Sequence, residues 1–255
     1  MIDIRLSDNL ELMAEMQDNT VDLIYCDILY GTGRKFKDYQ DLKPKREIIE
    51  EHYIPRIKEM HRILKDTGSI YLQMDYKISH WIRCVMDDVF CYENMVNQII
   101  WNYQRWANST KNFTRQNDHI LFYSKTKKYT FNNLFEPFSE KSKHKGKRYS
   151  EWENGSLKTK KYVNNDRLKN MSDVWNISYL NPMSKEKNGY NTQKPKSLIE
   201  RIIKASSNEG DLVADFYAGS FTTAEVCRDL NRNFIGCDIS EKAVQIGHAR
   251  VSGGF

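Results

Sequence analysis

The sequence lacks a long apolar run, a cysteine framework and a metal-binding motif. No stretch of its 255 residues approaches the roughly 18 consecutive apolar residues that a transmembrane helix needs. The first 16 residues carry acids among their apolar side chains, unlike a signal peptide. The five cysteines are odd in number and form no C-x-x-C pair, so neither a disulfide framework nor a zinc site is indicated. We therefore expect a cytoplasmic protein with no membrane partner and no bound metal.

The net positive charge is modest overall but concentrated in one part of the chain. The formal net charge is +5, yet residues 101–190 hold 18 Lys and Arg against 8 Asp and Glu. This excess lies in a stretch that is also rich in Trp, Tyr and Asn. Such an asymmetry indicates a polyanionic partner, although a solvated basic loop would have the same composition.

Strand-like and helix-like segments alternate at both ends of the chain, which predicts an α/β fold with a mostly parallel sheet and helices on both faces. The predicted strands are residues 2–6, 21–26, 69–74, 97–103, 119–124, 212–217 and 233–237. The predicted helices are residues 9–16, 48–64, 77–90, 196–206, 222–230 and 241–251. Between residues 126 and 189 the regular signal fades. We expect this stretch to be an irregular insertion outside the sheet, between a domain of residues 1–125 and its continuation in residues 190–255.

A carboxylate and an aromatic ring follow the apolar run of residues 21–26. Asp27 and Tyr30 enclose Ile28-Leu29, and Gly31-Thr32-Gly33 comes next. The carboxylate can accept a hydrogen bond from an exocyclic amine while the ring stacks on a flat ligand. This combination is suited to holding a nucleobase out of its helix for chemistry on its amino group.

A second constellation, residues 215–223, lies where a predicted strand ends and a helix begins. Its only glycine, Gly219, allows a close approach of backbone to ligand, and the helix start offers free N–H groups. About twenty residues later Asp238 ends the next strand, where an acid suits a ribose diol. One glycine is too few for a dinucleotide fingerprint, so the pattern indicates a pocket for another nucleoside-like cofactor. An ordinary strand–helix turn is the alternative.

In the order of these motifs the chain resembles the DNA amino-methyltransferases, specifically their permuted β group, over nearly its whole length. Residues 27–30 occupy the place of the family's Asp-Pro-Pro-Tyr, and Thr192-Gln193-Lys194-Pro195 matches its Thr-Gln-Lys-Pro. Residues 215–223 resemble its Asp-Pro-Phe-x-Gly-Ser-Gly-Thr-Thr loop, and residues 234–238 its ribose-binding strand. The resemblance implies a Rossmann-like methyltransferase fold in which the insertion, residues 126–189, is the target-recognition region.

The chain departs from the family pattern inside both motifs. Ile28 and Leu29 replace both prolines of the catalytic motif, which removes a rigid φ. In the cofactor loop Phe216 replaces a proline, Tyr217 a phenylalanine and Phe221 a glycine. Phe221 places a bulky side chain where the backbone passes close to the cofactor, so blockage of the pocket is one hypothesis.

The resemblance implies S-adenosylmethionine as the cofactor and a direct methyl transfer to a flipped adenine. Asp27 and the backbone carbonyl of Ile28 would accept the two amine N–H groups, and Tyr30, after Leu29, would stack on the base. The aspartate favours adenine N6 over cytosine N4. The residues implied in cofactor binding are Asp8, Lys194, Asp215, Phe216, Tyr217, Ala218, Gly219, Ser220, Thr222, Thr223 and Asp238. Taken alone, Asp8 reads as the N-cap of helix 9–16.

Double-stranded DNA is the expected partner, with a homodimer and a cognate restriction endonuclease as further possibilities. Basic and aromatic residues near the expected active-site edge and in the insertion are candidates for DNA contact: Arg105, Trp106, Lys111, Arg115, Lys141, Lys143, Lys145, Lys147 and Arg148. Three alternatives stay open: a DNA-binding pseudoenzyme of the same fold, methylation of cytosine N4, and methylation of RNA or a protein.

Overall fold

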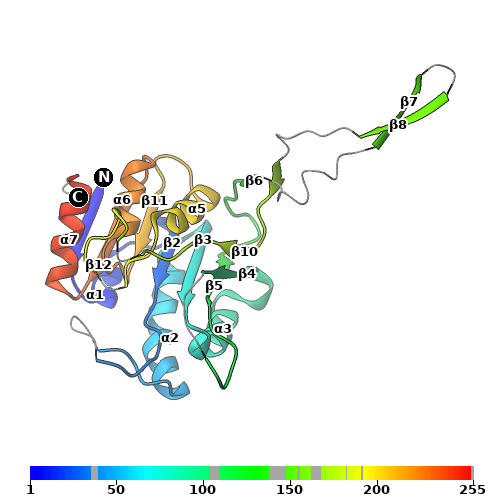
Figure 1. Cartoon of the computed structure of the whole chain (residues 1–255). Coiled ribbons are helices and arrows are strands. Elements are labelled where there is room, and N and C mark those ends of the chain that lie inside the picture. The colour runs from blue at the N-terminus through cyan, green and yellow to red at the C-terminus, as the bar shows by residue number, and fades with distance from the viewer. Residues whose placement is uncertain are drawn as a thin grey trace. The chain divides into compact units, whose positions relative to one another are not determined.

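The computed structural model describes residues 1–35, 40–103, 109–137, 148–153, 156–161, 168–181, 183–190 and 192–253. The chain divides into two units, described separately: Met1–Asn132 with Asp173–Phe255, and Asn133–Ser172 (Figure 1). The strands of the first unit are β1 (Ile2–Leu6), β2 (Val21–Asp27), β3 (Leu64–Met74), β4 (Met95–Asn102), β5 (Asn117–Ser124), β10 (Val174–Asn176), β11 (Leu212–Asp215) and β12 (Asn233–Asp238). Its helices are α1 (Asn9–Glu15), α2 (Arg46–Ile63), α3 (Tyr76–Phe90), the short η1 (Tyr92–Asn94), α5 (Lys196–Ser206), α6 (Thr222–Asp229) and α7 (Glu241–Val251).

The strands of the first unit form one eight-stranded sheet in the order β1-β12-β11-β2-β3-β5-β4-β10. Only β5 runs antiparallel to its neighbours, β3 and β4, and every other pair is parallel. This confirms the predicted mostly parallel α/β sheet. Each helix and strand predicted from the sequence is present. Most of their observed ends differ from the predicted ends by a few residues.

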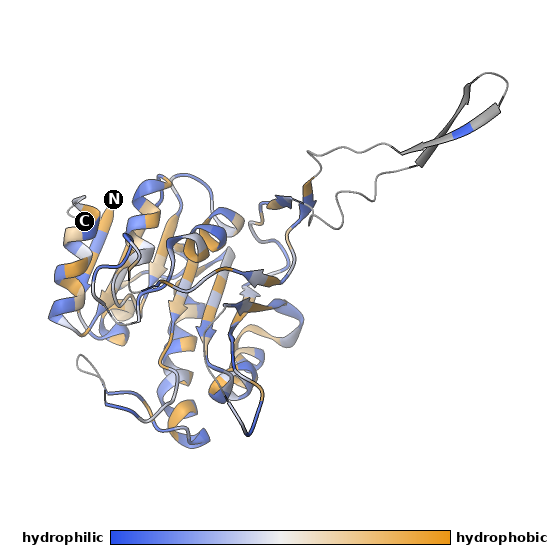
Figure 2. Cartoon of the chain, viewed as in Figure 1, coloured by the Kyte–Doolittle hydropathy of each residue, from blue (hydrophilic) through white to orange (hydrophobic). Residues whose placement is uncertain are grey.

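Two apolar cores lie on the two faces of this sheet. Helices α1, α2 and α3 pack on one face and α5, α6 and α7 on the other (Figure 1). Neighbouring residues of β2 alternate between them: Ile24 and Cys26 join the first core, and Leu23 and Tyr25 join the second. Because both faces of such a strand are covered, it reads as a continuous apolar run. The central strands are accordingly rich in apolar residues (Figure 2).

Five neighbouring parallel strands each deliver an aspartate at their carboxyl ends, which meet at one edge of the sheet. Asp8 and Asp75 follow β1 and β3, and Asp238, Asp215 and Asp27 end β12, β11 and β2. Strand order reverses between β11 and β2, since β2 and β3 succeed each other in one direction and β11 and β12 in the other. In open α/β sheets ligands bind beside this reversal point.

One expectation about the stretch 126–189 is wrong: it does contribute to the sheet. Strand β10 pairs in parallel with β4, with Trp175 opposite Trp101. The indole Nε1 of Trp101 donates to the carbonyl of Ile177 over 2.8 Å. A strand of three residues that pairs with a distant strand is too short to show a hydrophobic periodicity. It therefore could not be predicted from the sequence. Residues 126–132 also belong to the first unit.

The described residues of the second unit form two antiparallel strand pairs. β6 (Phe135–Pro137) pairs with β9 (Leu168–Asn170), and β7 (Arg148–Glu153) pairs with β8 (Ser156–Lys161). In the sequence, Asn154-Gly155 stands between β7 and β8, a dipeptide typical of two-residue hairpin turns. The segment is therefore less irregular than expected, and its role in target recognition stays a prediction.

Within the described ranges, no helix combines the length and the apolar character that crossing a bilayer requires.

Candidate active site

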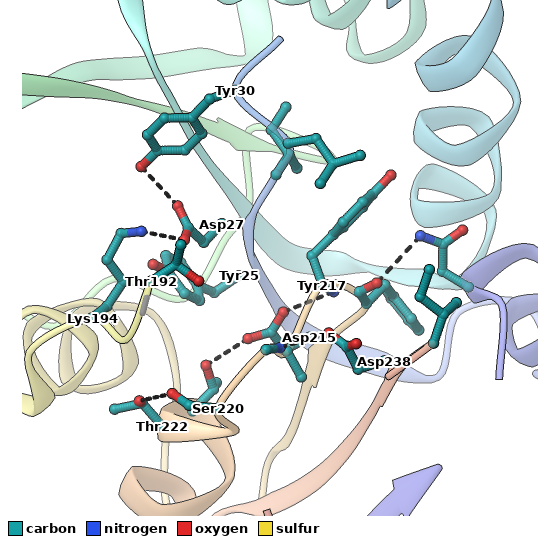
Figure 3. Close-up of a pocket in the computed structure, with 18 of the residues that line it drawn as sticks. Tyr25, Asp27, Tyr30, Thr192, Lys194, Asp215, Tyr217, Ser220, Thr222 and Asp238 are labelled. Carbon is teal, nitrogen blue, oxygen red and sulfur yellow. Dashed lines mark hydrogen bonds and ion pairs between the residues drawn. The ribbon is translucent and has the colours of Figure 1, made fainter. Parts of the chain in front are cut away.

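A cavity of about 250 Å³ opens at the carboxyl edge of the sheet in the first unit. Every residue predicted to act in catalysis or cofactor binding lines it, whether it comes from the first thirty residues or from the last sixty-five. Figure 3 shows Asp27 and Tyr30 at one end of this cavity and Asp215, Ser220 and Asp238 at the other. The fold thus brings the two constellations of the sequence into one site.

Asp27 is held between a lysine and a tyrosine (Figure 3). Lys194 Nζ forms an ion pair with Asp27 Oδ2, and Tyr30 Oη lies 3.0 Å from Asp27 Oδ1. The two side chains of the ion pair are only 17% and 14% exposed. Burial raises the pKa of Asp27 above its ordinary value, and the charge and hydrogen bond of Lys194 oppose that shift. Lys194, predicted beside the cofactor, contacts the carboxylate that is predicted to act in catalysis.

The loop after β2 is held by hydrogen bonds instead of prolines. The carboxylate of Asp41, which is buried, accepts the backbone N–H groups of Gly31 (3.1 Å), Thr32 (2.7 Å) and Leu42 (2.8 Å). The N–H of Ile28 donates to the carbonyl of Gln73 over 3.1 Å, a bond that a proline could not make. These contacts fix the backbone on both sides of Tyr30, at residue 28 before it and at residues 31 and 32 after it.

The same loop is also fixed from the helix side. Tyr53 of α2 donates its hydroxyl to the carbonyl of Leu29 over 3.2 Å. Gly31 has a φ of 62°, and a Cβ on it would lie 2.6 Å from Ile78 Cγ2. A side chain at position 31 would therefore clash with α3 as well as strain the backbone.

Asp215 closes the turn between β11 and α6. Its Oδ2 accepts the hydroxyl of Thr223 over 2.6 Å, and its Oδ1 accepts the N–H of Tyr217 over 3.1 Å. Burial raises the pKa of Asp215 to about 7, against these two hydrogen bonds; the carboxylates of Asp27 and Asp238 add to the increase. Asp215 therefore shapes the loop that lines the cavity.

Phe221 points away from the cavity, contrary to the blockage hypothesis. Its backbone adopts the left-handed conformation (φ 54°, ψ 36°) that glycine usually supplies. The ring is fully buried in the second core and meets the ring of Phe234 edge-on. Gly247 of α7 makes the necessary space, because a Cβ there would lie 2.7 Å from Phe221 Cγ. The substituted loop keeps a glycine-like path beside an open pocket.

The described residues predicted to contact DNA lie in the loop between β4 and β5. Lys111 and Arg115 are exposed, and the Arg115 guanidinium carbon stands 4.1 Å from the centre of the Tyr76 ring. Between them Phe113 is 97% exposed, a residue that sequence reasoning did not single out. The remaining candidates lie outside the described residues (Arg105, Trp106, Lys141, Lys143, Lys145 and Lys147) or, for Arg148 in β7, have only the backbone described.

A comparison with known protein families identifies the family of this chain. The family model described as DNA methylase matches residues 21–249. The chain belongs to this family. The type II methyltransferase M.HpaI of Haemophilus parainfluenzae is 32% identical over 251 residues, which cover 98% of this chain and 74% of that protein. The DNA adenine methyltransferase YhdJ of Escherichia coli K12 is 29% identical over 246 residues, 96% of this chain and 80% of YhdJ.

Solved structures of DNA methyltransferases share the fold of this methylase. The PvuII DNA methyltransferase, a cytosine-N4-specific enzyme, aligns with a TM-score of 0.70 at 16% identity, over 98% of this chain and 86% of that one. The complex of M1.HpyAVI with S-adenosylmethionine aligns with a TM-score of 0.63 at 20% identity, over 98% and 99%. The predicted Rossmann-like methyltransferase fold is therefore confirmed.

The cavity of this DNA methylase fits S-adenosylmethionine, the methyl donor of the family. Gly219 has a φ of 50°, and a Cβ on it would lie 3.3 Å from Tyr190 Cε1, so glycine keeps that wall open. Asp238 accepts the N–H groups of Gly219 (3.0 Å) and Ser240 (2.8 Å) and presents its carboxylate at the cavity wall. Ser220, near the start of α6, adds a hydroxyl suited to a carboxylate.

Asp8, predicted either to cap a helix or to contact the cofactor, is a helix cap that also lines the cavity. It caps α1 by accepting the N–H of Leu10 over 2.8 Å, and it lines the cavity. Arg56 Nη2 also reaches its Oδ2 at 3.3 Å. As a cap the residue is already explained, so its contact with the cofactor stays a prediction.

Two cavity residues of α2, His52 and Arg56, were missed by sequence reasoning. Arg56 donates to Asn9 Oδ1 over 2.7 Å and to the carbonyl of His52 over 2.9 Å, which ties α2 to α1. Burial, with the nearby charge of Arg56, lowers the pKa of His52 to about 4, so its imidazole is neutral at pH 7. Each directly precedes a core residue of α2, Tyr53 or Ile57. Their positions next to the buried apolar face of α2 were the only feature of the sequence that could have pointed to them.

Proposed function

We propose that this DNA methylase transfers a methyl group to the N6 amino group of adenine in double-stranded DNA. The observation that carries the proposal is the placement of Asp27 and Tyr30 in the same cavity as the loop of residues 215–223. A buried acceptor beside an aromatic ring suits a flipped base. The neighbouring loop suits a nucleoside-like methyl donor.

The residues of the chain orient and activate the amine. Adenine N6 is a poor nucleophile because its lone pair is delocalised into the ring. Asp27 accepts one N–H and the carbonyl of Ile28 the other, which favours the pyramidal nitrogen of the transition state. Tyr30 stacks on the base and holds the amine in place. S-adenosylmethionine, when bound, supplies an electrophilic methyl group, which Asp8, Ser220 and Asp238 would help to hold.

The raised pKa of Asp27 matches this role. A carboxylate in a dry site is a stronger acceptor than one in water, and it can take up the proton that the amine loses. Acceptance of an N–H requires the ionised form, so the methylation rate is expected to fall as pH decreases through the raised pKa.

Tritiated methyl transfer to mixed-sequence DNA tests the proposal. The wild-type chain should incorporate label, and nucleoside analysis should find N6-methyladenine. The Asp27→Ala variant should lose activity by about 100-fold or more, comparable to removal of one transition-state hydrogen-bonding group. Asp22→Ala is a suitable control, because Asp22 is an aspartate of the same strand that pairs with Lys65, outside the cavity.

Each other product identifies an alternative. N4-methylcytosine would overturn the choice of base. Label in RNA or protein competitors, and none in DNA, would overturn the substrate class. DNA binding without incorporation on any DNA would make the chain a pseudoenzyme.

The proposed setting is a bacterial restriction–modification system. M.HpaI is named a type II methyltransferase, which supports a cognate endonuclease as a functional partner. The DNA contact would use Lys111 and Arg115, whose cationic side chains can neutralise phosphates. A homodimer is also proposed, and light scattering of the purified chain with and without DNA would measure it.

A further inference from the structure

Another buried carboxylate, Asp118 of β5, lies beside the Tyr30 hydroxyl. Asp118 is only 5% exposed and does not line the cavity. It also belongs to none of the sequence motifs described above. Its Oδ2 lies 2.6 Å from Tyr30 Oη and accepts Gln73 Nε2 over 3.1 Å. Its Oδ1 accepts the hydroxyl of Tyr103 over 3.1 Å. A buried carboxylate with three donors is well satisfied.

The Tyr30 hydroxyl thus stands between two carboxylates with a single proton. Burial raises the pKa of Tyr30 well above its ordinary value, so the phenol keeps this proton at neutral pH. Its oxygen lies 2.6 Å from Asp118 and 3.0 Å from Asp27. The shorter distance is that of a charge-assisted O–H···O⁻ bond. The proton can be donated to only one of the two acceptors.

The hydrogen bonds of Gln73, which also contacts Asp118, support donation of the Tyr30 proton to Asp118. Tyr25 donates to Gln73 Oε1 over 2.8 Å, which turns the amide Nε2 of Gln73 towards Asp118 and Tyr30. Gln73 is fully buried, so its amide has no water to satisfy it in the opposite orientation. Strand β3 therefore presents a donor, not an acceptor, to the Tyr30 oxygen.

We propose that Asp118 is a positioning residue that binds the Tyr30 hydroxyl proton and so leaves Asp27 Oδ1 available to the amine of the substrate. The bond also fixes the plane of the Tyr30 ring on which the base would stack. Without it, the phenol would turn its proton to Asp27 and share the acceptor that the amine requires. The catalytic consequence rests on the proposed function, whereas the direction of the proton does not.

A double-mutant cycle on stability tests the proton's direction without any activity. Urea midpoints are measured for the wild type, Tyr30→Phe, Asp118→Asn and the double variant, and again with Asp27→Asn in place of Asp118→Asn. The shifts should be clearly non-additive for Tyr30 with Asp118 and nearly additive for Tyr30 with Asp27. Coupling to Asp27 equal to or larger than coupling to Asp118 would overturn the proposal.

The same variants test the catalytic consequence. Asp118→Asn should lower kcat about tenfold in the wild-type background and less than threefold in Tyr30→Phe, which has no proton to misplace. A merely structural Asp118 would lower kcat equally in both backgrounds, which would refute the positioning role. Tyr103→Phe is the matched control, because it removes another donor to Asp118 and should leave kcat within threefold. An inactive wild type would defeat the proposed function alone, since the stability cycle still decides where the proton lies.

Discussion

Two loops line one cavity: residues 27–33, proposed to act in catalysis (the catalytic loop), and residues 215–223, proposed to bind the cofactor (the cofactor loop). Both lack residues that usually fix such turns. After β2, where prolines are replaced by Ile28 and Leu29, the backbone is held by polar contacts, chiefly those of Asp41. After β11, where a glycine is replaced by Phe221, hydrogen bonds to Asp215 and Asp238 are joined by packing of the Phe221 ring against Gly247. Both turns are thus held by hydrogen bonds, and at its substituted position the second turn also depends on a packing contact between Phe221 and Gly247.

Changes to the hydrogen bonds of the catalytic loop should affect catalysis more than changes to the packing of the cofactor loop. Asp41→Ala removes the carboxylate that accepts three backbone N–H groups and leaves those of Gly31 and Thr32 without their partner. We expect kcat to fall about 100-fold, because a displaced Tyr30 and Asp27 lose their orientation. Methyl transfer to DNA measures the loss, and calorimetry with S-adenosylmethionine should show a nearly unchanged Kd.

Asp41→Asn is the matched control for this prediction. It keeps one acceptor oxygen and the side-chain volume, so its kcat should fall between those of the wild type and Asp41→Ala. Wild-type kcat in Asp41→Ala would show that the loop holds itself. Equal weakening of cofactor binding would show that Asp41 supports the whole cavity and not this loop.

Changes to the packing of the cofactor loop should affect the stability of the fold more than changes to the hydrogen bonds of the catalytic loop. Gly247→Ala places a Cβ 2.7 Å from Phe221 Cγ, inside the second core. Overpacking of this kind costs about 2 kcal/mol of unfolding free energy. Urea denaturation measures it, and cofactor affinity should fall as well because the displaced ring lies under the cofactor loop.

Phe221→Leu combined with Gly247→Ala tests whether the two positions act as a pair. The smaller side chain makes room for the new methyl group, so the double variant should be more stable than the sum of its single changes predicts. Strict additivity would contradict the pairing. Ala243→Gly is a control on the same helix, since it removes a buried methyl group without touching the Phe221–Gly247 contact.

The comparison also explains how far the sequence could predict this site. Asp27 and Asp215 could be placed because each ends an apolar run, and the carboxyl ends of parallel strands meet at one edge. Asp41 and Asp118 could not, because they belong to no local pattern and their contacts with the loop after β2 are to Thr32, 9 positions away, and Tyr30, 88 positions away. The direction of the Phe221 ring was equally inaccessible, since it depends on a glycine 26 residues later in the chain.

The smallest expected effect comes from restoring a family proline. Ile28→Pro removes the N–H that donates to the carbonyl of Gln73, which costs about 1 kcal/mol, and it also removes apolar side chain buried in the first core, which costs about 1 kcal/mol more. Stiffening of the unfolded chain offsets about 1 kcal/mol of this loss, so we expect the unfolding free energy to fall by about 1 kcal/mol and kcat to stay within threefold of the wild type. Ile28→Val, which keeps the N–H, is the control for side-chain size. A tenfold rise in kcat in Ile28→Pro would show that the hydrogen bonds of Asp41 and Gln73 do not replace the lost rigidity. The catalytic loop would then be the less organised of the two, although both line the same cavity.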